Sequence, residues 1–209
     1  MRTGLCYIVG AGEFTPRGLW PTANDLVLAA DGGYEALKDA GIAPHLLLGD
    51  MDSFSGKAPG VPVLRFPKHK DDTDMALAIR HARRLGYRRF RLYGASGGRQ
   101  DHVQANLQLM AALAHAHCEV RLVAPQYTVH AVSGGTLYLT GLVKGRTVSV
   151  FCAGDAATGV TLRGLQWEVT DARLTGHNPL GVSNRAAGDW ASVAVKKGIL
   201  LVFVMRGRY

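Results

Sequence analysis

The sequence predicts an α/β protein in two parts, an N-terminal, mostly parallel α/β domain followed by a small all-β sandwich domain. Short apolar runs alternate with helical patterns through residues 1–124, and strands that are joined through helices form parallel sheets. In residues 125–209 the helical period disappears, and strand-like runs follow one another between glycine-rich turns. Pro125 marks the expected boundary between the two domains.

The expected elements of the first domain are short. Each predicted strand is an apolar run that ends in Gly, Asp or Pro, and one helix carries Met75, Ile79 and Ala82 at helical spacing. The strands cover residues 6–9, 26–30, 46–48, 61–66, 89–93 and 120–124, and the helices cover residues 34–40, 74–85 and 101–117. Because ligands of such sheets bind at the carboxyl ends of the strands, the segments after the strands are the candidate sites.

The second domain is expected to consist of strands alone. They cover residues 127–132, 136–139, 147–151, 160–162, 167–169, 191–195 and 199–204. We expect a turn at residues 133–135 and a closing hairpin at Lys196-Lys197-Gly198, because glycine supplies the backbone conformations that tight turns need.

Composition excludes several classes of protein. The chain has 209 residues, 47% of them hydrophobic, which is enough to build a core and excludes a disordered chain. No apolar run reaches the roughly 18 residues of a membrane span, and the N-terminus lacks the apolar stretch of a signal peptide, so we expect a cytoplasmic protein without membrane contact. Three widely spaced cysteines predict neither disulfides nor a zinc site.

The formal net charge of +8 first suggests a nucleic-acid partner. Most of this excess lies after residue 120, however, and no aromatic-interleaved basic motif accompanies the arginines of residues 80–91. Between Gly49 and His102 the only acidic residues are six aspartates in three tight groups. A merely solvated surface would scatter its acids and include Glu. We therefore expect no nucleic-acid role, and the aspartates need a local explanation.

The first group of aspartates directly follows a predicted strand. Asp50 and Asp52 come after the apolar run 46–48 and would lie at the carboxyl edge of the sheet. Carboxylates at i and i+2 supply the oxygen ligands that Mg²⁺ prefers, although an ordinary turn rich in Asp and Gly has the same pattern.

The second group, Asp71-Asp72-Thr73-Asp74, leads into a predicted helix. Helix capping explains Thr73 or one of the acids, but three crowded acids repel one another unless a cation neutralises them. The nearby Lys68 and Lys70 suit a polyphosphate that brings such a cation.

The third group lies in a glycine-rich loop between a strand and a helix. Gly97 and Gly98 let backbone N–H groups approach a phosphate, and Arg99 can donate two hydrogen bonds to phosphate oxygens. Asp101 and His102 follow at the start of the helix.

The same segment fits a GxSxG nucleophile elbow centred on Ser96, which makes a serine hydrolase an alternative. Its partners would be Asp155 or Asp171 and then His177, and it leaves the earlier aspartates unexplained.

In their order and spacing, these motifs resemble those of the thiamin pyrophosphokinase family, over nearly the whole chain. The matching segments are Ala30-Asp31-Gly32-Gly33, Gly49-Asp50-Met51-Asp52-Ser53, Lys70-Asp71-Asp72-Thr73-Asp74, Gly97-Gly98-Arg99-Gln100-Asp101-His102 with Asn106, and Gly181-Val182-Ser183-Asn184. The resemblance implies a nucleotide-binding α/β domain that uses ATP and Mg²⁺, a β-sandwich domain that binds thiamin, and a homodimer whose thiamin sites lie at the subunit interface.

The resemblance also implies roles for single residues. The metal ligands would be Asp50, Asp52, Asp71, Asp74 and Asp101, of which Asp52, Asp74 and Asp101 would be catalytic; Thr73, Gly97, Gly98 and Arg99 would hold the ATP phosphates; and Trp167, Asn178, Ser183 and Asn184 would bind thiamin. Asp72 occupies a position that the family leaves variable, and Arg185 stands where the family usually has Glu.

The implied reaction transfers the pyrophosphoryl group of ATP to the hydroxyethyl oxygen of thiamin and gives thiamin diphosphate and AMP. A pyrophosphokinase that acts on another heterocyclic alcohol, such as a hydroxymethylpterin, is the nearest alternative. The serine hydrolase at Ser96 is an alternative of a different class.

Overall fold

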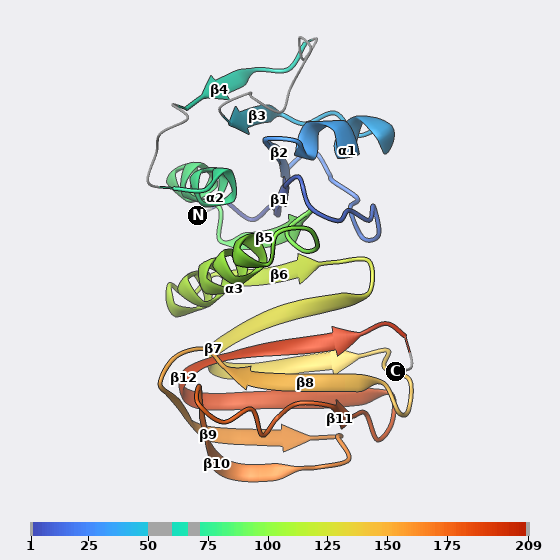
Figure 1. Cartoon of the computed structure of the whole chain (residues 1–209), viewed down its shortest axis with the longest axis vertical. Coiled ribbons are helices and arrows are strands. Elements are labelled where there is room, and N and C mark those ends of the chain that lie inside the picture. Colours follow the sequence, from blue (N-terminus) through green and yellow to red (C-terminus); the bar gives the residue numbers. More distant parts are fainter. Residues whose placement is uncertain (1, 50–59, 67–71, 208–209) are drawn as a thin grey trace. The chain divides into compact units, whose positions relative to one another are not determined.

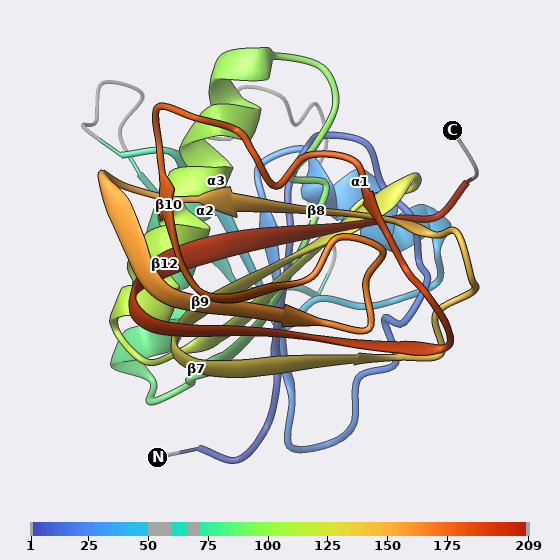
Figure 2. The ribbon, with the colours of Figure 1, turned by 90° about the horizontal axis from the view of Figure 1, so that it is seen from below.

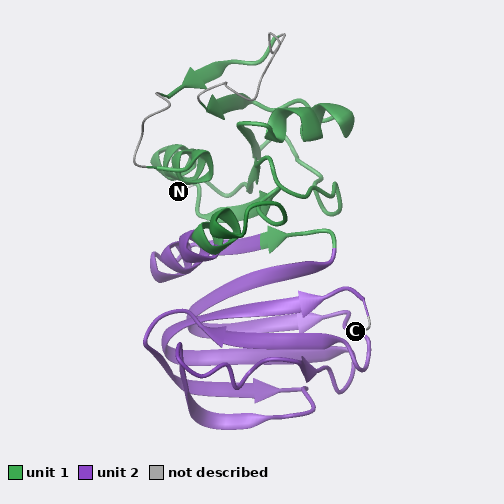
Figure 3. Cartoon of the chain, in the orientation of Figure 1, with its two compact units in different colours: residues 1–106, 122–125 green, residues 107–121, 126–209 purple. Residues whose placement is uncertain are grey.

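A computed structural model describes residues 2–49, 60–66 and 72–207. The chain divides into two compact units, one of residues 1–106 and 122–125 and the other of residues 107–121 and 126–209 (Figure 3). Helices and parallel strands build the first unit, and antiparallel strands build most of the second. The mixed α/β class that the sequence predicts is therefore confirmed.

A parallel sheet forms the centre of the first unit (Figure 1). Its strands are β1 (Cys6–Val9), β2 (Leu26–Ala30), β3 (Leu46–Gly49), β4 (Val63–Arg65) and β5 (Arg89–Tyr93), in the order β5-β1-β2-β3-β4. Strand β6 (Glu119–Val123) follows β5 in the strand order. The predicted bounds of β1, β2 and β5 are confirmed.

Both faces of this sheet are covered at β1, β2 and β3, which explains why these three strands are continuous apolar runs. On one face Val9 and Val27 pack with Leu37 of α1 (Gly33–Asp39), while the alternate residues Ile8 and Leu28 are buried on the other. Helix α2 (Asp74–Arg84) contacts β1, β2 and β3, and α3 (Gln100–His115) follows β5. Among the described residues, no helix is long and apolar enough to cross a membrane.

The second unit is built around two long strands, β7 (Tyr127–Thr140) and β12 (Trp190–Met205), which pair along their whole lengths (Figure 2). The first part of β12 also pairs with β9 (Ala156–Arg163), and its second part with β8 (Thr147–Cys152). The remaining strands are β10 (Val169–Thr175) on β9 and β11 (Asn184–Arg185) on β8. All these pairs are antiparallel.

The predicted turn at residues 133–135 and the predicted hairpin at residues 196–198 are wrong. Strands β7 and β12 run through both segments, and the register shifts where residues 196–198 lie opposite Gly134. Gly134 and Gly198 have φ of 59° and 93°, values that other residues rarely adopt. These glycines therefore form a β-bulge, which bends two long strands without ending them.

Candidate active site

A cleft of about 280 Å³ lies at the carboxyl ends of β1, β2 and β5. It is lined by the loops that follow these strands and by the first turns of α2 and α3, through Gly10, Ala11, Gly12, Ala30, Asp31, Thr73, Asp74, Met75, Gly94, Ala95, Ser96, Gly97, Gly98, Arg99, His102, Val103 and Asn106. This edge of a parallel sheet is where ligands of α/β proteins bind. The cleft is therefore the candidate active site of the first unit.

Two glycine-containing loops run side by side along the cleft. The N–H of Gly12 donates to the carbonyl oxygen of Gly94 over 2.8 Å, and the N–H of Gly10 donates to Tyr93 over the same distance. A Cβ atom on Gly94 would lie 2.0 Å from the carbonyl oxygen of Gly10, so the close approach requires glycine. Sequence reasoning missed residues 10–12 as cleft lining, because they do not complete a GxGxxG motif; their position directly after β1 was the signal.

Gly97 and Gly98 line the cleft, where the sequence predicts phosphate contacts. Their φ values are 74° and 61°. A Cβ on Gly97 would collide with the Glu13 side chain, whereas a Cβ on Gly98 would meet no atom within 4 Å. The backbone at Gly98 therefore borders open space on the side where other residues carry a side chain.

The first turns of two helices contribute to the cleft. Thr73 caps α2, because its Oγ1 accepts a hydrogen bond from the N–H of Ala76 over 3.2 Å. Asn106 of α3 donates through Nδ2 to the carbonyl oxygen of Ala95 over 2.9 Å and so ties this helix to the loop after β5. Helix N-termini present unpaired N–H groups and partial positive charge. Two of them at one cleft favour an anionic ligand such as a phosphate.

Arg99 and Asp101 bind each other in this structure. Nε of Arg99 is 3.2 Å from Oδ1 of Asp101, its Nη2 is 2.5 Å from Oδ2, and both side chains are mostly exposed. The hydrogen bonds from Arg99 lower the pKa of Asp101 and in turn raise the pKa of Arg99. Arg99 lines the cleft, whereas Asp101 is not among the described lining residues. The structure thus places Asp101 beside Arg99, the residue that is predicted to bind a phosphate.

The predicted metal ligands are described only in part. Asp50, Asp52 and Asp71 lie outside the described residues. Asp74 is half-buried and lines the cleft together with Asp31. Within the part of the chain that the structure describes, no three His, Cys, Asp or Glu side chains form a group that could hold a metal ion.

Asp72, which is not among the predicted metal ligands, forms an ion pair. Its Oδ2 is 2.6 Å from Nη2 of Arg80, on the next turns of α2. This ion pair gives Asp72 a structural partner.

The serine-hydrolase alternative finds no support at Ser96. The residue is only 2% exposed, and among the described residues its Oγ has no hydrogen-bond partner. A serine nucleophile needs a base within hydrogen-bonding reach. The histidine and aspartates that the alternative invokes, His177 with Asp155 or Asp171, belong to the second unit.

The predicted thiamin-binding residues lie in two segments of the second unit, the loop before β10 and the segment from the end of β10 to β11. Trp167 precedes β10 and is 56% exposed, while Asn184 is buried and binds the backbone of Trp167. Ser183, next to Asn184, has a φ of 59°, and its N–H donates to Oγ of Ser149 over 3.0 Å. Asn178 is exposed in a turn after β10, and no described hydrogen bond links it to the other three. The structure thus brings Trp167, Ser183 and Asn184 together.

Comparisons with known proteins match both parts of the chain. The family model "Thiamin pyrophosphokinase, catalytic domain" matches residues 17–122, and the model "Thiamin pyrophosphokinase, vitamin B1 binding domain" matches residues 136–200. Thiamine pyrophosphokinase of Bacillus subtilis is 26% identical over 187 residues, which cover 86% of each chain. Thiamine pyrophosphokinase 2 of Oryza sativa subsp. japonica is 25% identical, over 93% of this chain and 82% of the relative.

Solved structures show the same fold. The crystal structure of thiamine pyrophosphokinase from Bacillus subtilis has a TM-score of 0.86 at 23% identity, over 97% of this chain and 99% of that one. The thiamin pyrophosphokinase structure from Geobacillus thermodenitrificans has a TM-score of 0.84 at 25% identity, over 97% and 98%. With the catalytic-domain model matching half of the chain and the vitamin B1 binding model following it in order, this chain belongs to the thiamin pyrophosphokinase family.

Proposed function

We propose that this chain transfers the pyrophosphoryl group of ATP to the hydroxyethyl oxygen of thiamin and releases thiamin diphosphate and AMP. The observation that carries the proposal is the match of both family domains, in order, along one chain. The cleft of the first unit supports it, because glycine backbone and two helix N-termini meet there. We assign the ATP and metal chemistry to residues 1–124 and thiamin binding to residues 125–209.

The ATP phosphates would bind where donors converge in the cleft. Gly97 and Gly98 line the cleft with their backbone, Gly98 beside open space, and the hydroxyl of Thr73 can donate while its oxygen caps α2. The guanidinium of Arg99 matches two phosphate oxygens. Since Asp101 holds this guanidinium in the present structure, a bound phosphate would compete with Asp101 for Arg99.

The described residues fit Mg²⁺ in the chemistry of their donors. Asp74 and Asp31 bring carboxylates to the same cleft, and Mg²⁺ in proteins is held by one or two carboxylates together with substrate phosphates. The proposed ligands remain those predicted from the sequence, Asp50, Asp52, Asp71, Asp74 and Asp101. When bound, Mg²⁺ neutralises charge on the phosphates that react.

The protein's own groups would position the reactants and stabilise charge. The hydroxyl oxygen of thiamin forms a bond to the β-phosphorus of ATP while the bond from that phosphorus to the leaving oxygen of AMP breaks in line with it. Arg99 and the N-termini of α2 and α3 offset the charge on the phosphate oxygens. We propose Asp52, Asp74 and Asp101 as the catalytic carboxylates, one of which accepts the hydroxyl proton. Of the two that the structure describes, Asp74 and Asp101, Asp74 lines the cleft.

The thiamin site would use the exposed indole of Trp167. Thiamin carries a cationic thiazolium ring, and a cation over an aromatic face is attracted by the electrons of that face. Asn178, Ser183 and Asn184 are the other residues that we propose for the thiamin site, by contact with thiamin or by positioning a residue that contacts it. This assignment explains an exposed tryptophan whose backbone is held by a buried side chain.

We also propose a cytoplasmic homodimer with thiamin sites at the subunit interface, as the family resemblance implies. Mixing Asp74→Asn subunits with Trp167→Ala subunits tests this. With thiamin well below its KM, Trp167→Ala alone should keep about a tenth of the wild-type rate. If each site combines two subunits, random exchange yields heterodimers with one intact site, and the mixture should reach about a quarter of the wild-type rate, compared with about a twentieth if each site belongs to one subunit. Without any recovery in a verified mixed dimer, each site must belong to one subunit.

The direct test is incubation of the purified protein with ATP, MgCl₂ and thiamin, with the products separated by chromatography and identified by mass. Thiamin diphosphate and AMP in equal amounts are expected, and EDTA should stop their formation. Thiamin monophosphate with ADP would refute attack at the β-phosphorus. A parallel reaction with hydroxymethylpterin tests the alternative substrate, and faster turnover of the pterin would overturn the assignment of thiamin.

A further inference from the structure

Trp167 lies in the loop of residues 164–168, between β9 and β10, with more than half of its side chain exposed. Burial therefore does little to hold the indole, and its position depends on the loop backbone. A single side chain binds both polar groups of that backbone. The N–H of Trp167 donates to Oδ1 of Asn184 over 3.1 Å, and Nδ2 of Asn184 donates to the carbonyl oxygen of Trp167 over 2.7 Å.

Asn184 has little capacity left for a ligand. Its Oδ1 also accepts from the N–H of Arg185 over 2.8 Å, so both lone pairs of the amide oxygen are used. Its residue exposure is 4%, and one N–H of the amide is already donated to Trp167. The side chain is thus directed at the Trp167 loop.

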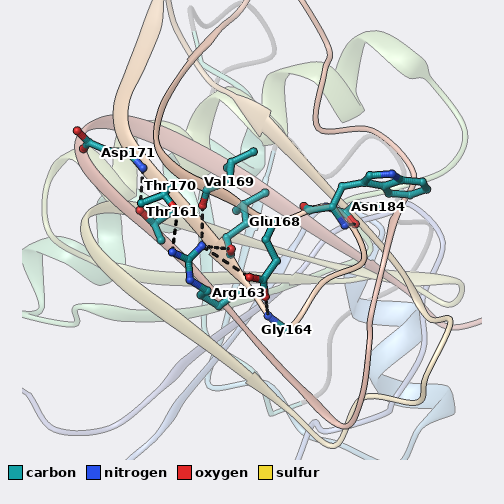
Figure 4. Close-up of polar contacts among 10 residues, drawn as sticks. Thr161, Arg163, Gly164, Glu168, Val169, Thr170, Asp171 and Asn184 are labelled. Atoms are coloured by element: carbon teal, nitrogen blue, oxygen red, sulfur yellow. Dashed lines mark hydrogen bonds and ion pairs between the residues drawn. The ribbon is translucent and has the colours of Figure 1, made fainter.

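A second contact closes the same loop at its base (Figure 4). Oε1 of Glu168 accepts from the N–H of Gly164 over 2.6 Å, which joins the two ends of the loop. Arg163 lies beside this contact, with Nη1 3.8 Å from Oε2 of Glu168 and 2.9 Å from the carbonyl oxygen of Val169. Arg163 therefore connects the end of β9 with the start of β10.

The rest of the loop is paired with the segment that carries Asn184. The N–H of Gln166 donates to the carbonyl oxygen of Arg185 over 2.7 Å, and Leu165 forms a β-bridge with Ala186. Gly164 has a φ of 71°, and a Cβ there would lie 2.5 Å from a carbonyl oxygen of β12. Pairing on one side and closure at the base both restrain the backbone of the loop.

We infer that Asn184 is a positioning residue that presets the indole of Trp167 as a platform for a flat cationic heterocycle, supported by Glu168 and Arg163. The inference rests on the proposed function and assigns Asn184 a different role from the direct thiamin contact that the sequence suggests. A preset aromatic surface binds its ligand more tightly, because no conformational freedom of the loop is lost on binding.

A double-mutant cycle separates the two roles of Asn184. Asn184→Ala and Trp167→Ala should each raise the KM for thiamin about tenfold and leave the KM for ATP unchanged, and Asn184→Ala should add less than about twofold on the Trp167→Ala background. Gln166→Ala, in the same loop but with an exposed side chain, is the matched control and should change neither constant. Multiplication of the two single effects would overturn the inference, because it would mean that Asn184 contacts thiamin itself.

A second measurement does not depend on turnover. In a Trp20→Phe/Trp190→Phe protein, Trp167 is the only tryptophan, and time-resolved fluorescence anisotropy reports the motion of its indole. Asn184→Ala and Glu168→Ala should both increase fast indole motion, while Glu168→Gln, which keeps the oxygen that accepts from Gly164, should not. The Glu168 variants also serve if Asn184→Ala fails to fold. Unchanged anisotropy in these variants refutes the positioning role, whatever their activity. If the indole is held in the parent protein and becomes mobile in the variants, but the parent protein does not convert thiamin, the proposed function alone is refuted.

Discussion

Replacing Thr73 by Ala should weaken both the fold and the binding of ATP, for two different physical reasons. The first is the cap of α2. Oγ1 of Thr73 accepts from the N–H of Ala76 over 3.2 Å, and loss of such an N-cap costs about 1 kcal/mol. For a chain of this size, 1 kcal/mol corresponds to a fall in Tm of about 2–4 °C.

The second reason is the hydrogen of the same hydroxyl. Because Oγ1 acts as the acceptor in the cap, its hydrogen is available to a phosphate oxygen in the cleft that Thr73 lines. A hydrogen bond to a charged group contributes about 1.5–3 kcal/mol. Its loss should raise the KM for ATP about 10- to 100-fold, since 1.4 kcal/mol corresponds to a factor of ten.

Two further variants separate the cap from the phosphate contact. Thr73→Ser keeps the hydroxyl and should keep both the Tm and the KM for ATP. Thr73→Asp keeps a capping oxygen but places a negative charge beside the phosphates, so it should keep the Tm and lose ATP binding. Calorimetry gives the Tm, and AMP release gives the KM. A Thr73→Ala protein with a lowered Tm and an unchanged KM for ATP would refute the phosphate contact and leave Thr73 a cap alone.

Three other replacements test the cleft and the base of the sheet. Asp74→Asn should lower kcat about 100-fold or more with the circular dichroism spectrum unchanged, and a near-normal rate would remove this carboxylate from the reaction. Ser96→Ala should keep kcat within about twofold and should not lower the Tm, because the buried hydroxyl lacks a partner among the described residues; loss of activity would contradict this. Burial opposes ionisation of Asp25, but hydrogen bonds from the N–H groups of Thr22 and Leu5 and from the Thr22 hydroxyl outweigh it and lower the pKa. The stabilisation by Asp25 is therefore complete above the ordinary carboxyl pKa and is lost as the pH falls through the lowered pKa. Asp25→Asn should reduce the free energy of unfolding by about 2 kcal/mol at neutral pH and by less below about pH 4. Urea titration at both pH values measures this difference.

The elements that could be predicted from the sequence are those whose pattern is local. Strands β1 and β2 are apolar throughout because both faces of the parallel sheet are buried there, and β5 combines two arginines with three buried apolar residues, so the bounds of all three strands follow from their local pattern. Gly134 and Gly198 are different. Their positive φ suits a tight turn and a β-bulge equally, and the choice depends on the pairing of β7 with β12, which are distant in the sequence. A local pattern cannot contain that information.

In the candidate site, too, the local sequence predicts some features and not others. The spacing of the acidic groups predicts that Asp74 and the loop of Gly97 and Gly98 meet at one sheet edge, and the described cleft contains them. The roles of other residues depend on which partner a side chain reaches. Asn184 sits in a motif that suggests ligand contact, yet its amide binds the backbone of Trp167, a partner 17 residues away.

The pairing of Asp101 with Arg99 also affects the proposed reaction. Each side chain neutralises the other in the present structure, so an acid in a predicted metal-binding motif does not stand as an isolated charge. Under the proposed function, the phosphates of ATP compete for the guanidinium, and the carboxylate of Asp101 then loses the partner that lowers its pKa. A cation that arrives with ATP would replace that partner. Binding of the nucleotide and the proposed metal role of Asp101 are therefore expected to be coupled through Arg99, and Arg99→Ala should weaken both.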